Sequence, residues 1–177
     1  MAAVSAVLLA AGYGTRLYPL TKDRPKALLP LGDGVVLTPM LDALSRIPGL
    51  SKIVLVTNHR FLGPFQTWAS AHAPHLEIVD DGSASPEERL GAIPDLQLGL
   101  ARAAAGDDVL VLGTDNLFTW PLADFVTFAN TKRPAASLAV WQAPSKAAAR
   151  QFGVVELDRD GRVVRCVEKS TDPPSLM

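Results

Sequence analysis

Three continuous apolar runs mark the chain before any motif is considered. They are Val4–Ala10, Lys52–Thr57 and Asp108–Gly113, and Val, Leu and Ile dominate them with little polar alternation. Runs of this length and composition are typical of strands that are buried on both faces of a parallel sheet. The pattern predicts two further strands, one in the segment LEIVDD that begins at Leu76 and one at Ala136–Gln142.

Helical patterns lie between these runs. The segment TPMLDALSRIPG, which starts at Thr38, spaces its apolar residues for one helix face and ends at a Pro-Gly pair. Helices are also expected at Phe61–His72, Pro94–Gly106 and Leu122–Thr131. Strand–helix alternation with short links predicts an α/β fold, in which helices cover both faces of a mostly parallel sheet. The segment FGVVELDRDGRVVRCVEK adds a β-hairpin near the C-terminus, with its turn at Asp160-Gly161.

Composition and charge narrow the class of protein. The 177 residues are 48% hydrophobic and 20% charged, which fits one globular domain spanning residues 1–177. A formal net charge of −1 gives no reason to expect a nucleic-acid or membrane partner. No apolar run approaches the roughly 20 residues that span a bilayer, and the single cysteine, Cys166, cannot form an internal disulfide. We therefore expect a soluble, cytoplasmic protein.

A glycine-containing loop follows the first strand. Gly12 and Gly14 form a G-x-G pair, which fits a plain tight turn about as well as an anion site. A dinucleotide-binding loop would have a third glycine where Leu17 stands and a helix directly after it, and the prolines that follow prevent a long helix. A Walker A motif is also absent from the sequence.

Two basic residues make the phosphate interpretation the better one. Backbone N–H groups of a glycine loop can bind an anion, Arg16 adds a planar fork suited to phosphate oxygens, and Lys26 adds a mobile positive charge. Asp115 follows the strand Asp108–Gly113, and the carboxyl ends of parallel strands share one sheet edge. A carboxylate there suits Mg²⁺, although an Asp-Asn turn at a strand end would look the same in the sequence.

The stretch LAAGYGTRLYPLTKDRPKALLP resembles the long signature of the sugar-nucleotide pyrophosphorylases, which include glucose-1-phosphate thymidylyltransferases and uridylyltransferases. The segments RLGAI, VLGTDNLF, FGVVELDRDGRV and VEKS resemble further family motifs in the same order. The resemblance implies a three-layer α/β/α Rossmann-like nucleotidyltransferase fold. It also implies an enzyme that joins a sugar 1-phosphate to a nucleoside triphosphate, gives an NDP-sugar and releases pyrophosphate with Mg²⁺ as cofactor.

The resemblance also assigns roles to individual residues. Arg16, Lys26 and Asp115 would be catalytic, with Arg16 on the β- and γ-phosphates and Asp115 on the metal ion. Gly153, Glu168 and Lys169 would contact the sugar and its phosphate. The nucleotide would be bound by Leu9, Ala10, Ala11, Gly12, Gly14, Thr15, Arg16, Leu90, Gly91, Ala92 and Asp115.

The chain departs from the family pattern in two places. Thr114 stands where the family usually has glycine before the metal aspartate, and its side chain could crowd the nucleotide or the ion. Relatives continue past the Glu168-Lys169 element into a strand with a second metal aspartate, so we expect a C-terminally truncated chain. Two alternatives stay open: a non-catalytic nucleotide-binding module, and a cytidylyltransferase for a phosphorylated alcohol such as phosphocholine. The nucleobase and the sugar are undecided, and an oligomer is possible.

Overall fold

A computed structural model describes residues 2–177 and gathers the chain into two compact units. The first unit is Met1–Arg133 and the second is Pro134–Met177. The assignment of residues 1–177 to one nucleotidyltransferase domain stays a prediction.

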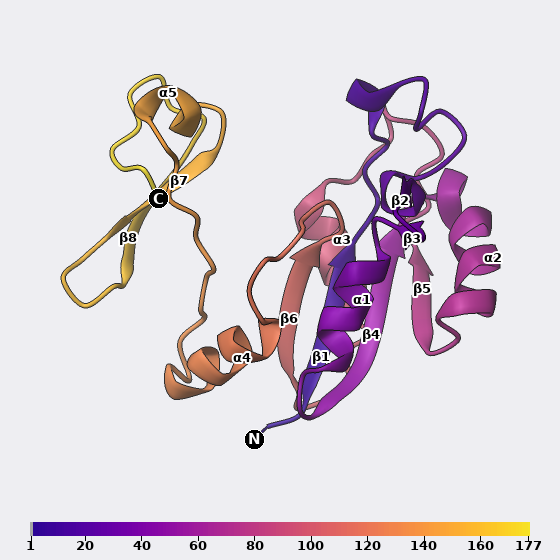
Figure 1. Cartoon of the computed structure of the whole chain (residues 1–177), viewed down its shortest axis with the longest axis horizontal. Coiled ribbons are helices and arrows are strands. Elements are labelled where there is room, and N and C mark those ends of the chain that lie inside the picture. Colours follow the sequence, from indigo (N-terminus) through magenta and orange to yellow (C-terminus); the bar gives the residue numbers. More distant parts are fainter. Residues whose placement is uncertain (1) are drawn as a thin grey trace. The chain divides into compact units, whose positions relative to one another are not determined.

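A four-stranded parallel sheet forms the centre of the first unit (Figure 1). Its strands stand in the order β5 (Leu76–Asp80), β4 (Leu50–Thr57), β1 (Val4–Leu9) and β6 (Asp108–Gly113). The four apolar runs at these places are thus confirmed as strands, and β4 begins two residues earlier than its pattern predicted. The α/β fold class with a Rossmann-like parallel sheet is confirmed as well.

Successive residues of β1 face opposite sides of the sheet, as strand geometry requires. Ala6 and Leu8 belong to the main core, which α1 (Thr38–Ser45), α2 (Leu62–His72) and α4 (Leu122–Thr131) cover from one face. Helix α3 (Ala92–Leu100) covers the other face, where Gly99 packs directly against Val7. Helices on both faces bury β1 and the second half of β4, which explains why these runs lack polar alternation, whereas Val111 on the edge strand β6 stays exposed.

The strand order reverses at β1. From β1 the chain builds outward through α1, β4, α2 and β5, and then returns through α3 to place β6 on the other side of β1. Leu9 pairs with Gly113 at the carboxyl ends of these two neighbours. Open α/β sheets bind ligands at such a switch point, because the loops that leave the two strands diverge there and leave a crevice.

Irregular segments surround this edge. The proline-rich loop after β1 holds only two single 3-10 turns, η1 (Thr15–Leu17) and η2 (Lys26–Leu28), and then the short pair β2 (Pro30–Leu31) and β3 (Gly34–Val35). This confirms that no long helix follows the glycines. A third 3-10 turn, η3 (His59–Phe61), precedes α2.

Helix α3 is shorter than its pattern predicted. It ends at Leu100, and the predicted end at Gly106 is wrong. The N–H of Ala104 donates to the hydroxyl of Ser5, 3.1 Å away on β1, instead of continuing the helical hydrogen bonds. A side chain 99 residues away in the sequence thus takes the place of the next helical carbonyl.

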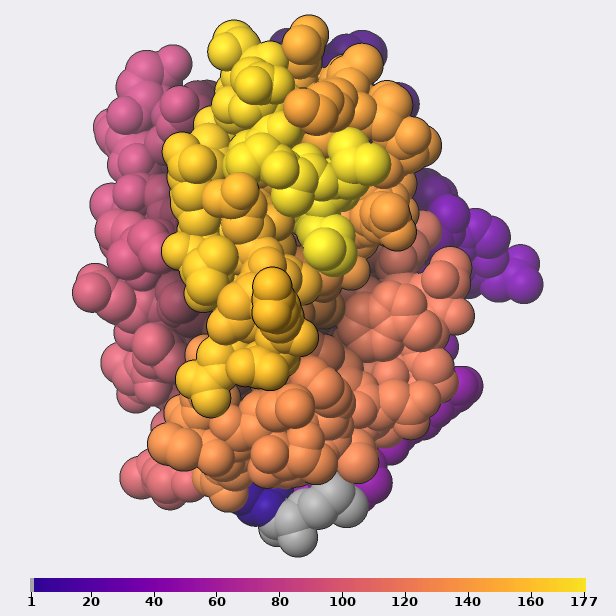
Figure 2. All heavy atoms as spheres, turned by 90° about the vertical axis from the view of Figure 1, so that its left-hand side faces the viewer, coloured from indigo at the N-terminus to yellow at the C-terminus, as the bar shows by residue number. Residues whose placement is uncertain are grey.

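The second unit has a small core of its own. It contains α5 (Lys146–Ala149) and an antiparallel hairpin of β7 (Gly153–Leu157) and β8 (Val163–Glu168), which confirms the predicted hairpin. Ala143, Ala149 and Val154 form its buried centre. Figure 2 shows the atoms of this unit in orange to yellow.

The strand predicted at Ala136–Gln142 is wrong, because the described structure is irregular there. Leu138, Val140 and Trp141 are exposed. A β-rich pattern becomes a strand only when a neighbouring strand supplies hydrogen-bond partners. Within residues 2–177 this segment has no ladder.

Candidate active site

An open cavity of about 530 Å³ lies at the carboxyl ends of β1 and β6. Its wall combines the glycine loop, the turn η2 and the residues after β6. The lining residues are Leu9, Ala10, Gly12, Gly14, Arg16, Leu17, Lys26, Ala27, Thr114 and Asp115. The fold therefore gathers into one cavity all three residues that were predicted to be catalytic and six of those predicted to bind nucleotide, with Arg16 and Asp115 belonging to both sets.

Gly14 gives the loop its shape. Its φ of 63° lies in the left-handed region that favours glycine, and the Thr21 hydroxyl donates to its carbonyl at 2.7 Å. A Cβ at this position would come within 3.2 Å of the Thr21 side chain. The glycine thus allows the chain to turn tightly and places Arg16, which is exposed, in the next turn beside the cavity.

Lys26 and Asp115 meet across the cavity wall. The Lys26 ammonium lies 3.2 Å from an Asp115 carboxylate oxygen, although 89 residues separate them in the sequence. The two side chains keep 41% and 58% of their surface exposed, so both charges remain accessible to a ligand. Asn116 donates to the other Asp115 oxygen at 3.4 Å. Such an exposed ion pair adds little to the stability of the fold. It does place a cation and an anion side by side at the cavity.

Thr114 stands where a side chain could crowd the nucleotide or the ion, and the structure gives this side chain a definite place. It is buried, and its hydroxyl and its N–H both donate to the Leu9 carbonyl, at 3.1 Å and 3.2 Å. The side chain therefore fastens the end of β6 to the end of β1 and also lines the cavity. Because Thr114 directly precedes Asp115, this hydrogen bond holds the backbone next to the Asp115 carboxylate.

Leu90, Gly91 and Ala92 lie at the start of α3, on the connection that leaves β5. Gly91 flanks the helix with a φ of 95°, and none of the three lines the cavity. Ala11 and Thr15 are likewise absent from its lining, although both belong to the glycine loop. Their assignment to nucleotide binding stays a prediction.

Gly153, Glu168 and Lys169 form a group within the second unit. Gly153 and Glu168 are paired across β7 and β8, and the Glu168 carboxylate covers Gly153, where a Cβ would be 2.7 Å from one of its oxygens. Lys169 has a φ of 44° and its ammonium lies 3.5 Å from Glu168. The hairpin thus brings these three predicted sugar-phosphate residues together.

A buried acidic side chain, Asp95, lies in the first turn of α3. Asp95 is 6% exposed, and its Oδ1 is buried with no hydrogen-bond partner among the described residues. Burial, followed by the nearby Asp81 carboxylate, raises the pKa of Asp95 to about 6.

Sequence analysis missed the polar side chains that hold the glycine loop. Tyr13 and Asn58 are both buried, and each makes hydrogen bonds to or from the loop that carries Gly12 and Gly14. Asn58 had a local signal, because it directly follows a strand and accepts from the Phe61 N–H as a helix-capping residue does. Tyr13 had none, because its partner Ser83 lies 70 residues away.

The donor set fits a magnesium ion that is shared with a substrate. Mg²⁺ binds carboxylate oxygen and water, and it commonly uses one or two protein carboxylates together with substrate phosphates. Asp115 offers one exposed carboxylate at the cavity, beside the Lys26 ammonium and in the same lining as Arg16. No cluster of three His, Cys, Asp or Glu side chains that could hold a metal ion occurs in residues 2–177.

A parallel sheet with a glycine loop, a cation and a carboxylate at its switch point defines an α/β protein that handles phosphate groups. More particularly, the chain belongs to the nucleotidyl transferase family, whose model matches residues 5–176.

The chain is similar to several proteins with known names. It is 31% identical to the UTP–glucose-1-phosphate uridylyltransferase of Haloferax volcanii, over 97% of this chain and 68% of that protein. It is 32% identical to the glucose-1-phosphate thymidylyltransferase of Streptomyces antibioticus and 30% identical to the mannose-1-phosphate guanylyltransferase of Mycobacterium tuberculosis, in each case over 97% of this chain and 46% of the relative. The chain thus spans about half the length of most of the curated relatives it matches.

The fold resembles a crystal structure from Bacillus anthracis that contains sucrose and is described as a glucose-1-phosphate thymidylyltransferase. The TM-score is 0.81 at 22% identity, covering 98% of this chain and 68% of that one. In the part of the chain that is described here, no helix is long and apolar enough to cross a membrane.

Proposed function

We propose that the chain carries the nucleotide-binding and catalytic part of a cytoplasmic sugar-1-phosphate nucleotidyltransferase. The reaction joins a sugar 1-phosphate to a nucleoside triphosphate, and it yields an NDP-sugar and pyrophosphate. The observation that carries the proposal is the single cavity in which Gly12, Gly14, Arg16, Lys26 and Asp115 meet at the switch point of the sheet. Three relatives named for this type of transfer support it.

The two substrates determine what the site must do. A sugar phosphate oxygen is largely ionised near neutral pH, so it can attack without a general base. The main barrier is the repulsion between two polyanions, and a protein lowers it by holding them in line and by offsetting their charge.

Each of the residues at the cavity would bind or stabilise a different part of the two substrates. The N–H groups of the glycine loop and the Arg16 fork bind the β- and γ-phosphates, which depart as pyrophosphate. Lys26 is already held 3.2 Å from Asp115 and offers its ammonium to the α-phosphate as the nucleophile approaches. Thr114 holds Asp115 in place through its bond to the Leu9 carbonyl.

Asp115 would hold Mg²⁺, which when bound offsets phosphate charge and helps to align the two substrates. In the second unit, Gly153, Glu168 and Lys169 are assigned to the sugar and its phosphate by the resemblance to the family, and the hairpin presents a carboxylate and an ammonium side by side. Leu90, Gly91 and Ala92 are assigned to the base and ribose.

Pyrophosphate release tests the proposal. The chain is incubated with each common nucleoside triphosphate, with Mg²⁺, and with glucose 1-phosphate, mannose 1-phosphate or phosphocholine. At least one pair of triphosphate and sugar phosphate should release pyrophosphate. Arg16→Ala should lower that rate by 100-fold or more, on the order of the loss seen when a charge-stabilising donor is removed. Its unfolding midpoint should stay close to that of the wild type, because Arg16 is exposed.

Arg24→Ala is the matched control. Arg24 is an exposed arginine of the same loop and does not line the cavity, so its removal should leave the rate nearly unchanged. Equal rates for the Arg16 variant and the wild type would contradict the assignment. Nucleotide binding without turnover of any pair would indicate a binding module, and turnover only of CTP with phosphocholine would indicate the alcohol-phosphate alternative.

A further inference from the structure

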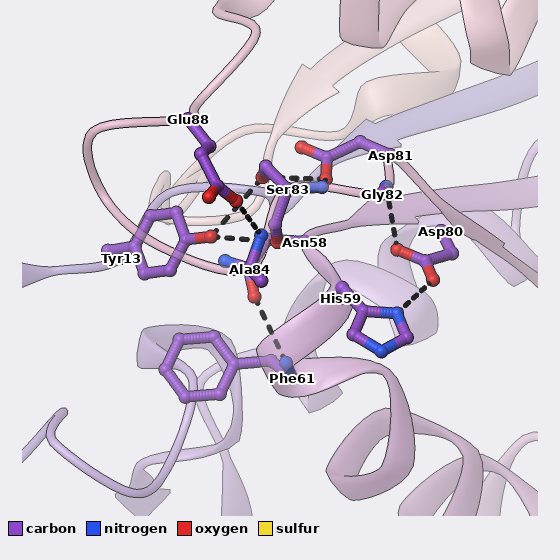
Figure 3. A network of polar contacts seen from close by, with 10 residues as sticks. All are labelled: Tyr13, Asn58, His59, Phe61, Asp80, Asp81, Gly82, Ser83, Ala84 and Glu88. Atoms are coloured by element: carbon purple, nitrogen blue, oxygen red, sulfur yellow. Dashed lines mark hydrogen bonds and ion pairs between the residues drawn. The ribbon is translucent and has the colours of Figure 1, made fainter.

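Tyr13 stands between two cavity-lining glycines but turns away from the cavity. Gly12 and Gly14 line the site, whereas the Tyr13 side chain is buried and only 5% exposed. Its ring packs against Phe61 with centroids 6.2 Å apart. Its hydroxyl donates to the Ser83 carbonyl at 2.8 Å and also lies 3.2 Å from the Ser83 hydroxyl (Figure 3).

Ser83 belongs to a different part of the site, the connection that runs from β5 to α3. Its N–H and hydroxyl both donate to Asp81 at 2.7 Å, and its carbonyl also accepts from the N–H of His59 at 2.9 Å. The N–H of Asp81 in turn donates to the Thr57 carbonyl at the end of β4. These hydrogen bonds hold Ser83 in one position, and the Tyr13 hydroxyl is hydrogen-bonded to it.

A second side chain, that of Asn58, holds the loop by a hydrogen bond on the other side of Gly12. The Asn58 amide donates to the Ala11 carbonyl at 2.9 Å, and its oxygen accepts from the Phe61 N–H at 3.0 Å. Asn58 has no exposed surface. The loop around Gly12 is thus held from outside the cavity at both Ala11 and Tyr13.

These hydrogen bonds from Tyr13 and Asn58 matter because glycines leave a backbone free to sample many conformations. A loop that must offer its N–H groups to phosphates in one arrangement binds better when that arrangement exists before the ligand arrives. The segment that starts at Ser83 continues to Leu90 and Gly91, which are assigned above to the nucleobase and ribose. One hydroxyl therefore connects the phosphate-binding loop to the base-binding loop.

We propose that Tyr13 is a positioning residue that holds the triphosphate loop and the residue 81–91 loop in one arrangement, through its hydroxyl on Ser83. The inference rests on the proposed function, because it takes a nucleoside triphosphate as the ligand. A purely structural role would lower the stability of the fold when the hydroxyl is lost, but would leave the affinity for the triphosphate unchanged.

Tyr13→Phe separates the two roles, because it removes the hydroxyl and keeps the ring. Binding of the triphosphate with the highest affinity for the wild type is measured by calorimetry with Mg²⁺. The Kd should rise roughly 3- to 10-fold, which is the range expected for the loss of one hydrogen bond. The other tyrosine of the chain provides the control, because Tyr18 lies in the same loop with its side chain exposed, and Tyr18→Phe should leave the Kd unchanged.

Amide hydrogen exchange adds a readout that needs no nucleotide. In Tyr13→Phe, residues 81–91 should exchange faster than in the wild type, while the β4 amides keep their protection. In a Ser83→Ala background, the Tyr13→Phe change should have a smaller effect on the Kd, because part of the tie is already lost.

The outcomes keep the two proposals apart. If the wild type binds no triphosphate, the proposed function fails. Hydrogen exchange alone then tests whether the Tyr13 hydroxyl holds residues 81–91 in place. Faster exchange in residues 81–91 would support it, and unchanged exchange would overturn it. If the wild type binds nucleotide and the Tyr13→Phe Kd equals that of the wild type, the positioning role is overturned even where stability falls.

Discussion

Replacing Asp95 by asparagine is expected to stabilise the protein near neutral pH. Burial of the Asp95 carboxylate, followed by the charge of Asp81, raises its pKa from 3.8 to about 6, so ionisation opposes folding. One pKa unit corresponds to about 1.4 kcal/mol, and the whole difference therefore to about 3 kcal/mol. Screening by water and the attraction of a carboxylate to the N-terminus of α3 reduce this amount, so we expect a gain of about 1–2 kcal/mol.

The sign of the pH dependence follows from the same values. The folded pKa lies above the unfolded one, so the full contribution of Asp95 to stability is present below about pH 4 and is lost as the pH rises through about 6. The difference between Asp95→Asn and the wild type should therefore grow between about pH 4 and pH 6 and level off above. Urea denaturation at several pH values between about 4.5 and 7.5 measures it.

Asp124 offers a matched control. It also lies in the first turn of a helix, α4, but its side chain is exposed. Asp124→Asn should not stabilise, and it should lose about 0.3–1 kcal/mol of attraction to the helix N-terminus. The reasoning is refuted if Asp95→Asn is less stable than the wild type at neutral pH, or if the difference between them does not change with pH.

Two further changes test the packing that shapes the site. Gly99→Ala should destabilise by about 1–2 kcal/mol, because its Cβ would lie 2.4 Å from a Val7 methyl carbon and overpacking outweighs the better helix propensity. Gly63→Ala is the helical control with open space around it, and it should be neutral or slightly stabilising in the same denaturation assay. Thr114→Val should lose about 0.5–1.5 kcal/mol with the bond to the Leu9 carbonyl, whereas Thr114→Ser should keep most of it, and equal stability of the two variants would contradict this account.

Local sequence patterns were sufficient to predict the strands of the sheet, the presence of helices on its two faces and the loop after β1. These features are local: unalternating apolar runs specify buried strands, and the closely spaced Pro19, Pro25 and Pro30 prevent a long helix in the loop after β1. Arg16, Lys26 and Asp115 could be selected for the same reason, since a phosphate site at strand ends needs these residue types. Their roles stay predictions, although their meeting in one cavity agrees with the selection.

The contacts between groups that are distant in the sequence could be learned from the folded chain alone. It paired Lys26 with Asp115, fastened Thr114 to Leu9 across 105 residues, and attached Tyr13 to Ser83. It also left Ala136–Gln142 without a ladder despite its β-rich pattern. Hydrogen-bond partners across a sheet or between loops are set by how the strands are ordered, and a residue carries no local signal of a partner that the fold supplies.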